Sequence, residues 1–476
     1  QFEIGNNSEK RESVLSKLNQ IIGRKGRSIS GEILKIDCPK KATEAFFGIL
    51  RDFIEEHCSI RFPNKSLKYS VSIPACFGSN QRREYRLALE GAGIKVDDRF
   101  FIDEPNAAFL SWLADDSGQE KPKFQAGAGA KNVLIFDFGA GTCDLSILSV
   151  SSKGEMGLKL KNLALSRFSA LGGDDLDREI ARRFLFPLIC ERNKIEPDLI
   201  PPHVYREHFE PKLQALAERI KIRASNRINR ENVSPEDRVL LQLYGPIEIE
   251  IPKKWYDRFT GQGVRTVIVP EELALSFGDF EEAIYRFIGG REPAPDPTGE
   301  PLRRFFRRLT GARPVSEQSI LDLLENVVFK AGIKKQNVDY LLFIGGSSNL
   351  RYVQEAVIEF FDEAPEVIIP DDIQTHVSRG VALHSFLSHG LQENPLTEIL
   401  AEDIYLLVKG GEQLVFKAGT EIPASIAVGS LYKTDRRQRE VEFPFLAGSE
   451  KRVVARVSTK LPPSLSEDHE ITLEAQ

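Results

Sequence analysis

"VLIFDFGAGTCDLSIL", residues 133–148, sets an acid and several small residues between two apolar segments. The apolar segments predict two inner strands of one sheet. The turn between them consists of Gly139, Ala140, Gly141 and Thr142. Small residues let backbone amides approach a phosphate without a side-chain clash, and the threonine adds a hydroxyl donor. The stretch therefore predicts a phosphate-binding strand–turn–strand unit; the alternative is a plain β-turn with polar residues.

The same turn carries an acid on each side. Asp137 ends the first apolar segment, and Asp144 opens the second. A carboxylate repels a phosphate at close range, so neither acid is expected to bind phosphate directly. Mg²⁺ keeps several of its waters and bridges phosphates. We therefore expect Asp137 and Asp144 to hold a Mg²⁺ ion through water.

Two further glycine pairs, Gly172-Gly173 and Gly345-Gly346, stand at predicted strand-to-helix junctions. A weaker signal of the same kind is Gly91 with Gly93. One glycine pair predicts only a turn. Several of them at strand ends, together with an acidic turn, predict a nucleotide held between two lobes.

The composition is that of a globular chain with two or three domains: 476 residues, 41% hydrophobic and 28% charged. A net charge of -6 argues against general nucleic-acid binding, which usually needs a basic face. No apolar run approaches the ~18 residues of a membrane span, and residues 1–10 show no signal-peptide pattern. The five cysteines lie far apart in the sequence, which predicts reduced thiols. We therefore expect a cytoplasmic protein with neither nucleic acid nor a membrane as partner.

Two regions differ from the rest of the chain in composition or in hydrophobic pattern. Residues 289–314 concentrate proline, glycine and arginine and predict an exposed insertion; the run "RRFFRR" at 303–308 leaves open a site for an acidic partner. Beyond residues 388–395 the chain changes to short alternating apolar runs separated by turn residues. That pattern predicts a β-rich module of roughly eighty residues.

Five blocks of the sequence stand out together: "SIPACFGSNQRREYRLALEGAGI", "FIDEPNAAF", "FDFGAGTCDLSIL", "LGGDDLD" and "LLFIGGSSNLRYVQE". In order and in spacing, these blocks resemble the seventy-kilodalton heat-shock (DnaK-type) chaperones, which belong to the actin, hexokinase and heat-shock superfamily. The resemblance covers roughly residues 15–388 and continues more faintly to the end. It implies an α/β chain with a two-lobed actin-like ATPase fold, its lobes ribonuclease-H-like, followed by a partial β-sandwich.

The resemblance also implies domain boundaries. A nucleotide-binding domain would be followed by a linker and then by part of a substrate-binding domain. The expected ranges are 1–388 for the nucleotide-binding domain (1–130 the remainder of lobe I, 131–370 lobe II with the insertion near 289–314, 371–388 a closing helix), 389–401 for the linker, and 402–476 for the partial β-sandwich.

The catalytic residues implied by the resemblance are Glu104, Asp137 and Thr142. Asp137 corresponds to the acid that binds metal-bound water, and the turn 139–142 to the second phosphate loop, with Thr142 near the γ-phosphate. Glu104, in "DEP", corresponds to the glutamate that positions the attacking water. The alternative for Glu104 is an acid at a helix N-terminus, favoured by the helix dipole.

Other residues correspond to the family's switch and nucleotide contacts. Pro74 and Arg82 correspond to the proline switch and arginine relay between domains; for Arg82 the alternative is a solvated helix charge. Three residues of "AERIKIRAS" lie at spacings that place them on one helical face, where a surface ion pair is the alternative. Together with Gly139, Ala140, Gly141 and Thr142, the implied nucleotide contacts are Gly172, Gly173, Glu218, Lys221, Ser225, Gly345, Gly346, Ser347 and Asn349.

Several positions depart from the family pattern. The family's first phosphate loop has no counterpart here, and its catalytic lysine falls on Asn19, with Lys17 two residues out of register. The middle glycine of the second loop is Ala140, and the arginine that stacks on adenine falls on Asn349, with Arg351 two residues later. Losing preorganised donors costs roughly 10²–10³ in rate each. We therefore expect these 476 residues to hydrolyse ATP weakly or not at all, as a truncated fragment or a divergent paralogue.

The function that the resemblance implies is an ATP-dependent chaperone active in protein folding and the stress response. ATP hydrolysis to ADP and phosphate would be coupled to the binding and release of extended apolar peptides. The resemblance also implies a J-domain-type co-chaperone and a nucleotide-exchange factor as partners. Two alternatives stay open: a non-hydrolysing nucleotide-sensing scaffold, and a small-molecule (sugar) kinase of the same superfamily.

Overall fold

The protein is described from a computed structural model, whose described part is mixed α/β. Its internal contacts divide the chain into two compact units, one of Gln1–Ser111 with Val377–Gln476 and one of Trp112–His376. The described residues are 38–63, 66–75, 77, 79–97, 100–120, 123–124, 129–152, 158–166, 171–255, 263–289, 319–391, 396–400, 403–408, 410–422, 424–432, 440–448, 451–461 and 470–475.

Three sequence predictions fall outside these residues. They are the "IIGRK" segment with its neighbours Lys17 and Asn19, residues 290–314 of the predicted insertion, and the "RRFFRR" run within it. No helix among the described ranges combines the length and the apolar character needed to cross a bilayer.

A mixed sheet forms the centre of the second unit, with strand order β11-β10-β3-β4-β5. β3 pairs antiparallel with β4 and parallel with β10. Val133, Leu134, Ile135 and Phe136 of β3 are fully buried, which is the burial that their apolar run predicted. The strands are β3 (Lys131–Phe138), β4 (Cys143–Ser152), β5 (Leu158–Leu165), β10 (Tyr340–Ile344) and β11 (Glu366–Ile368).

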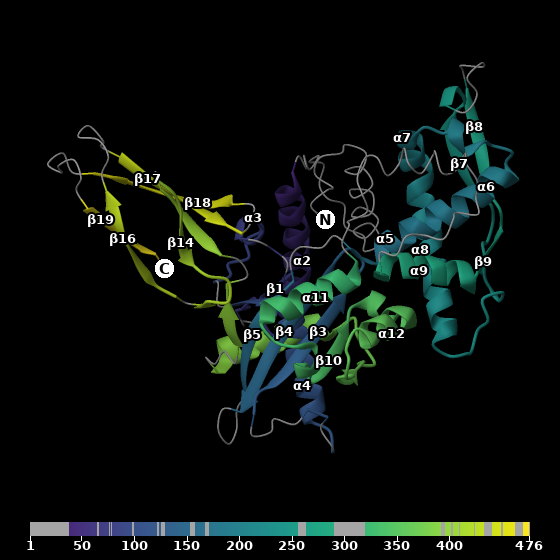
Figure 1. The fold of residues 1–476 in the computed structure, drawn as a ribbon. Coiled ribbons are helices and arrows are strands. Elements are labelled where there is room, and N and C mark those ends of the chain that lie inside the picture. Colours follow the sequence, from purple (N-terminus) through teal and green to yellow (C-terminus); the bar gives the residue numbers. More distant parts are fainter. Residues whose placement is uncertain are drawn as a thin grey trace. The chain divides into compact units, whose positions relative to one another are not determined.

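Helix α11 (Ile320–Ala331) packs on strands β4 and β5 (Figure 1). Ser319 caps its N-terminus by accepting a hydrogen bond from the Asp322 amide, while the Asp322 carboxylate accepts one from the Ser319 amide. Gly332 ends the helix with a left-handed φ of 67°, which glycine adopts without strain. Local sequence thus determines both ends of a helix whose apolar face covers the sheet.

The rest of the second unit is a helical layer with two antiparallel strand pairs, β6 with β9 and β7 with β8. It shares one continuous apolar core with the central sheet. The elements are α5 (Gly173–Ile180), η4 (Ala181–Leu185), α6 (Phe186–Arg192), η5 (Pro197–Leu199), α7 (Pro202–Val204), η6 (Tyr205–Phe209), α8 (Glu210–Ile228), β6 (Arg238–Gln242), β7 (Ile247–Pro252), η7 (Lys253–Trp255), β8 (Val264–Val269), β9 (Glu272–Ser276), α9 (Phe277–Gly289), η8 (Lys335–Asn337), η9 (Gly346–Asn349) and α12 (Arg351–Glu359).

The first unit contains a parallel strand pair, β1 with β2, and a small apolar core around Phe77, Leu89 and Phe101. Gly380 allows a close helix crossing, since a Cβ there would lie 1.7 Å from the Ala107 carbonyl oxygen. The elements are α2 (Pro39–Arg61), β1 (Val71–Ile73), α3 (Ser79–Gly91), β2 (Phe101–Asp103), α4 (Glu104–Ser117), α13 (His376–Ser385) and η10 (Phe386–Leu391).

His384 of α13 is fully buried, and its Nε2 lies 3.2 Å from the Ser388 hydroxyl. Among the described residues, its Nδ1 atom has no hydrogen-bond partner. Burial, with a further contribution from His389, lowers the pKa of His384 to about 4. His384 is therefore held neutral in the folded chain.

Replacing His384 with asparagine is expected to remove an acid-sensitive loss of stability. Between about pH 6.5 and about pH 4 the unfolded chain takes up a proton that native His384 does not, so wild-type stability falls by up to about 3 kcal/mol over that window. The asparagine variant lacks this contribution. Urea unfolding across the window checks it, and a variant whose profile runs parallel to that of the wild type would contradict it.

The described elements from residue 396 to the C-terminus are all strands, as the alternating pattern predicted. A four-stranded antiparallel sheet has the order β14-β13-β17-β18, and β16 pairs with β19. Leu406, Val415, Val428 and Phe443, which come from both sets of strands, form one buried apolar cluster. β12 lies within the predicted linker 389–401. The strands are β12 (Leu396–Ile399), β13 (Ile404–Val408), β14 (Gly411–Phe416), β15 (Glu421–Ile422), β16 (Ile426–Tyr432), β17 (Glu440–Ala447), β18 (Arg452–Lys460) and β19 (Glu470–Ala475).

Candidate functional site

The turn between β3 and β4 is open to solvent, while its two ends are anchored. The strand register pairs Asp137 with Asp144 across the hairpin. The Gly139 amide donates to the Thr142 carbonyl at 3.0 Å and closes the turn. Ala140 and Gly141 are exposed at its tip. The hairpin therefore presents a short stretch of backbone to solvent directly above two acids.

The N-terminus of α5 docks onto this turn. The Gly173 amide donates to the Gly139 carbonyl at 3.0 Å, and the Asp174 amide donates to the Ala140 carbonyl at 2.7 Å. A Cβ at Gly172 would lie 2.2 Å from the Ala140 carbonyl oxygen. Because that contact is with backbone, no side chain fits there unless the turn moves. The first two predicted glycine motifs are thus in direct contact.

The third glycine motif, which follows β10, passes beside the acid of the hairpin. Gly345 has a φ of +83°, and a Cβ there would lie 2.5 Å from the Phe138 carbonyl oxygen and 2.6 Å from Asp137 Oδ1. Its amide donates to the Ile373 carbonyl at 3.2 Å. The conformation and the space both require glycine here, and they bring the Gly345 turn against the end of β3.

Helix α8 joins these segments through two buried polar side chains. Lys221 donates to the Gly173 carbonyl at 3.0 Å and to Asp177 Oδ2 at 2.7 Å. Ser225, one turn further on, donates to the Asn349 carbonyl at 3.0 Å. The hairpin, the start of α5, one face of α8 and the Gly345 turn therefore lie together and form one candidate site.

The remaining predicted contacts are placed differently. Glu218 is exposed, whereas Ser347 is buried, with its hydroxyl 2.2 Å from where a Gly173 Cβ would stand. Gly346 is exposed and lies against Gln374, a residue that the sequence did not single out. The site thus has a buried side formed by α5 and α8 and an exposed side formed by the turns.

Asn349 contributes its backbone carbonyl, which accepts hydrogen bonds from Ser225 and, at 3.1 Å, from Asn229. Asn349 itself is exposed to solvent. Arg351 donates to Glu355 at 2.7 Å and to the Ile228 carbonyl at 3.5 Å. The guanidinium group of Arg351 therefore lies at the C-terminal end of α8, engaged with protein atoms.

The two carboxylates of the hairpin lie opposite each other, so that each disfavours the ionisation of the other. Asp144 is almost fully buried, at 2% exposure. Burial, and secondarily the charge of Asp144, raise the pKa of Asp137 to about 7. A cation beside the pair would offset both effects. Two carboxylates below a solvent-open turn are groups that suit a hydrated Mg²⁺, which keeps several of its waters.

Three further predicted residues meet in the first unit. Glu104 begins α4 directly after β2 and is half-buried. Pro74 follows β1, whose parallel register pairs Ile73 with Asp103. Arg82 donates to the Phe77 carbonyl at 3.0 Å and forms an ion pair with Asp103. Pro74, Arg82 and Glu104 therefore gather at the C-terminal end of the β1–β2 pair.

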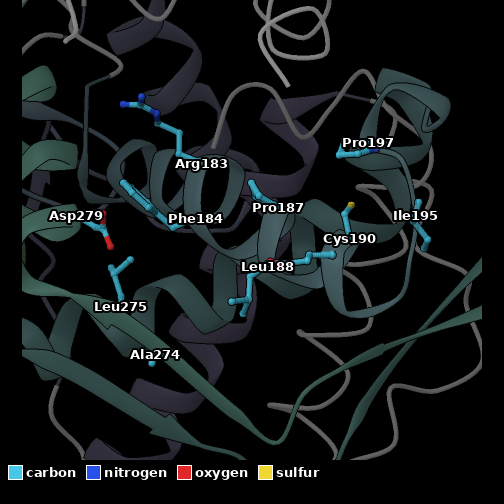
Figure 2. A pocket seen from close by; sticks show the side chains of 11 residues that line it. Arg183, Phe184, Pro187, Leu188, Cys190, Ile195, Pro197, Ala274, Leu275 and Asp279 are labelled. Carbon is cyan, nitrogen blue, oxygen red and sulfur yellow. The ribbon is translucent and has the colours of Figure 1, made fainter. Parts of the chain in front are cut away.

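A separate pocket of about 450 Å³ opens elsewhere in the second unit. Phe184 from η4, Leu188 from α6 and Leu275 from β9 are among the side chains that line it (Figure 2). Asp279 lies at one end of this pocket and is already hydrogen-bonded to Ser276. None of the hairpin residues lines this pocket. The site residues predicted from the sequence therefore lie outside this pocket.

The family model described as "Hsp70 protein" matches residues 55–238, which include the hairpin, α5 and α8. Curated relatives include the chaperone protein DnaK of Mesomycoplasma hyopneumoniae, 26% identical over 79% of this chain and 49% of its own length. The chaperone protein dnaK3 of a Synechocystis species is 24% identical over 89% of the chain and 45% of its own. The chaperone protein dnaK of Guillardia theta is 24% identical over 86% and 52%.

The chain thus spans about half the length of the curated relatives it matches. The family match begins within α2 and ends at the start of β6. The relatives extend the similarity over most of the chain. The chain is therefore similar to DnaK-type chaperones over most of its length, and residues 55–238 match the Hsp70 protein model itself.

Proposed function

We propose that this chain carries the nucleotide site of an ATP-dependent molecular chaperone of the Hsp70 type. One observation supports this above the others: the hairpin turn, the start of α5, one face of α8 and the Gly345 turn converge on one site through direct hydrogen bonds. The curated relatives named above are all called chaperones, which supports the same proposal.

In this proposal the exposed turn binds the phosphates of ATP or ADP. Amides at Ala140 and Gly141 and the Thr142 hydroxyl donate to phosphate oxygens. Asp137 and Asp144 hold the waters of a Mg²⁺ ion, which would neutralise phosphate charge. At the other end of the site, the adenosine lies against α8 and the Gly345 turn, where Lys221, Ser225, Ser347 and the backbone of Gly345–Asn349 provide its contacts.

Hydrolysis would depend on orienting one water molecule, because phosphoryl transfer needs positioning more than covalent chemistry. Glu104 is the residue proposed for that task. Its backbone position is constrained by β2 on one side and by the Asp103–Arg82 ion pair next to it. The departures at Ala140 and Asn349 lead us to expect slow turnover.

The proposal extends to the domains and their coupling. Residues 1–388 would form the two-lobed actin-like nucleotide-binding domain, 389–401 the linker, and 402–476 part of a β-sandwich that binds extended apolar peptides. Pro74 and Arg82 would transmit the nucleotide state to the linker. The partners would be unfolded polypeptide clients, a J-domain-type co-chaperone and a nucleotide-exchange factor, in the cytoplasm.

A second candidate is a nucleotide sensor that binds ATP without hydrolysing it. Ala140 favours it, because it stands at the exposed tip of the turn where the family pattern has the middle glycine of the second phosphate loop. A changed phosphate loop can retain nucleotide binding while it loses the alignment that hydrolysis needs. Nothing among the described contacts favours a sugar kinase in the same way.

Glu104→Ala is expected to bind ATP as the wild type does and to hydrolyse it about a hundredfold more slowly, because only the orientation of water is lost. Single-turnover hydrolysis and fluorescent-nucleotide titration measure the two properties separately. Wild-type turnover no faster than that of the variant would contradict the enzymatic proposal and leave the sensor. Affinity for an extended apolar peptide that ignores ATP would contradict the chaperone proposal.

A further inference from the structure

A buried ion pair lies directly behind the hairpin site. Lys221 Nζ is 2.7 Å from Asp177 Oδ2, and their side chains are only 11% and 1% exposed. Burying two charges costs several kcal/mol per ion unless their geometry and additional hydrogen bonds offset it. Such a pair contributes little to stability compared with apolar residues of the same size. Its presence beside the site therefore suggests a role other than packing.

The ammonium group is connected to the phosphate turn through a single residue. Lys221 donates to the Gly173 carbonyl at 3.0 Å, and the Gly173 amide in turn donates to the Gly139 carbonyl at 3.0 Å. An ammonium has three donors, and these contacts with Asp177 and Gly173 account for two of them. Lys221 thus stands between the phosphate turn and Ser225, where the sugar of a nucleotide spanning the site would lie.

Only one of the two carboxylate oxygens of Asp177 has a hydrogen-bond partner among the described residues. Its Oδ2 atom accepts from Lys221, whereas Oδ1 is buried with no hydrogen-bond partner among the described residues. Burial raises its pKa to about 6 against the opposing effect of Lys221, and the charges of Glu218 and Asp174 raise it further. At neutral pH Asp177 is therefore ionised, and its described ion pair is with Lys221.

We propose that Asp177 is a positioning residue of the nucleotide site, which fixes the Lys221 ammonium where it donates to the ribose hydroxyls. This inference rests on the proposed nucleotide function. The carboxylate also neutralises the lysine, so that Lys221 acts as an oriented donor to the sugar and not as a free charge drawn to the phosphates. Because Asp177 lies behind Lys221, it acts on the nucleotide only through that side chain.

The first test needs no nucleotide. Amine-selective dimethylation of the full chain, followed by mass spectrometry, is expected to modify Lys221 slowly in the wild type and about tenfold or more faster in Asp177→Asn, because the ammonium loses its charged partner. Asp177→Glu should restore part of the protection. Glu179→Gln, which removes a carboxylate from the same helix, is the matched control and should leave Lys221 unchanged. Equal rates in the wild type and Asp177→Asn would overturn the inference.

The second test uses ATP and 2′,3′-dideoxy-ATP. Asp177→Asn is expected to lose about tenfold or more in affinity for ATP but little for the dideoxy analogue, because only the sugar contact changes. The ratio of wild-type to variant affinity for ATP should also fall towards one between about pH 7 and about pH 5, as Asp177 becomes protonated in the wild type. A merely structural role would weaken both nucleotides alike and would contradict the inference.

The outcomes separate this inference from the function beneath it. A wild type that binds no ATP contradicts the proposed function itself. A wild type that binds ATP, with an Asp177→Asn variant that binds it equally well, contradicts the positioning role alone.

Discussion

Asp137→Asn is expected to stabilise the nucleotide-free chain by up to about 4 kcal/mol above about pH 7. Burial and the neighbouring Asp144 raise the pKa of Asp137 from 3.8 to about 7, so the folded chain is penalised whenever this carboxylate ionises. Between those values the native state binds more protons than the unfolded state, and wild-type stability falls as pH rises. The amide carries no charge and avoids that loss.

Urea unfolding in the presence of a chelator, at about pH 4 and about pH 8, measures this difference. The gap between variant and wild type should be small at the lower pH and largest at the higher. Asp339→Asn is the matched control: that carboxylate pairs with Lys131 at 2.7 Å on the same sheet, so its loss should not stabilise the chain. A gap that does not change with pH would contradict the prediction. The same Asp137 variant should bind Mg²⁺–ATP more weakly, since stability and function compete at such sites.

Gly172→Ala is expected to abolish nucleotide binding and to destabilise the chain by about 1–3 kcal/mol. The new methyl group would stand 2.2 Å from the Ala140 carbonyl oxygen and 2.5 Å from the Gly141 carbonyl carbon. Because both contacts are with backbone, the turn must move away from α5. The two hydrogen bonds from Gly173 and Asp174 to the turn would then be lost together.

Fluorescent-nucleotide titration and urea unfolding check the two parts of this prediction. Gly141→Ala provides the stability control, because a Cβ at Gly141 meets no atom within 4 Å. Its unfolding free energy should stay within about 0.5 kcal/mol of that of the wild type. If both alanine variants unfold alike, the clash with the turn does not determine stability, and the close approach of Gly172 has no energetic role.

The hairpin could be predicted from sequence because its signals are local. The apolar runs on either side of the turn predict inner strands, and the glycines between them predict the turn itself. The convergence of the three glycine motifs was also predictable, since each follows a buried strand and strand ends meet at a sheet edge. In the structure Gly139, Gly172 and Gly345 lie close together, and their contact with a nucleotide stays a prediction.

The polar contacts of the site could not be predicted in the same way. Lys221 and Asp177 are 44 residues apart, and no local pattern links them. Helical spacing placed Glu218 with Lys221 and Ser225, but spacing does not say which residues of a helical face are covered, and Glu218 is exposed. Asn349 contributes through its carbonyl, which a comparison of side chains cannot reveal.

The docking of α5 on the hairpin also limits how this region can evolve. The carbonyl groups of Gly139 and Ala140 are matched one to one with consecutive amides of another segment. An extra or missing residue in the loop would put both carbonyls out of phase with those amides, whatever its side chain. Amino-acid identities there can drift, but the count of positions separating Asp137 from Asp144 is fixed by a helix that lies outside the hairpin.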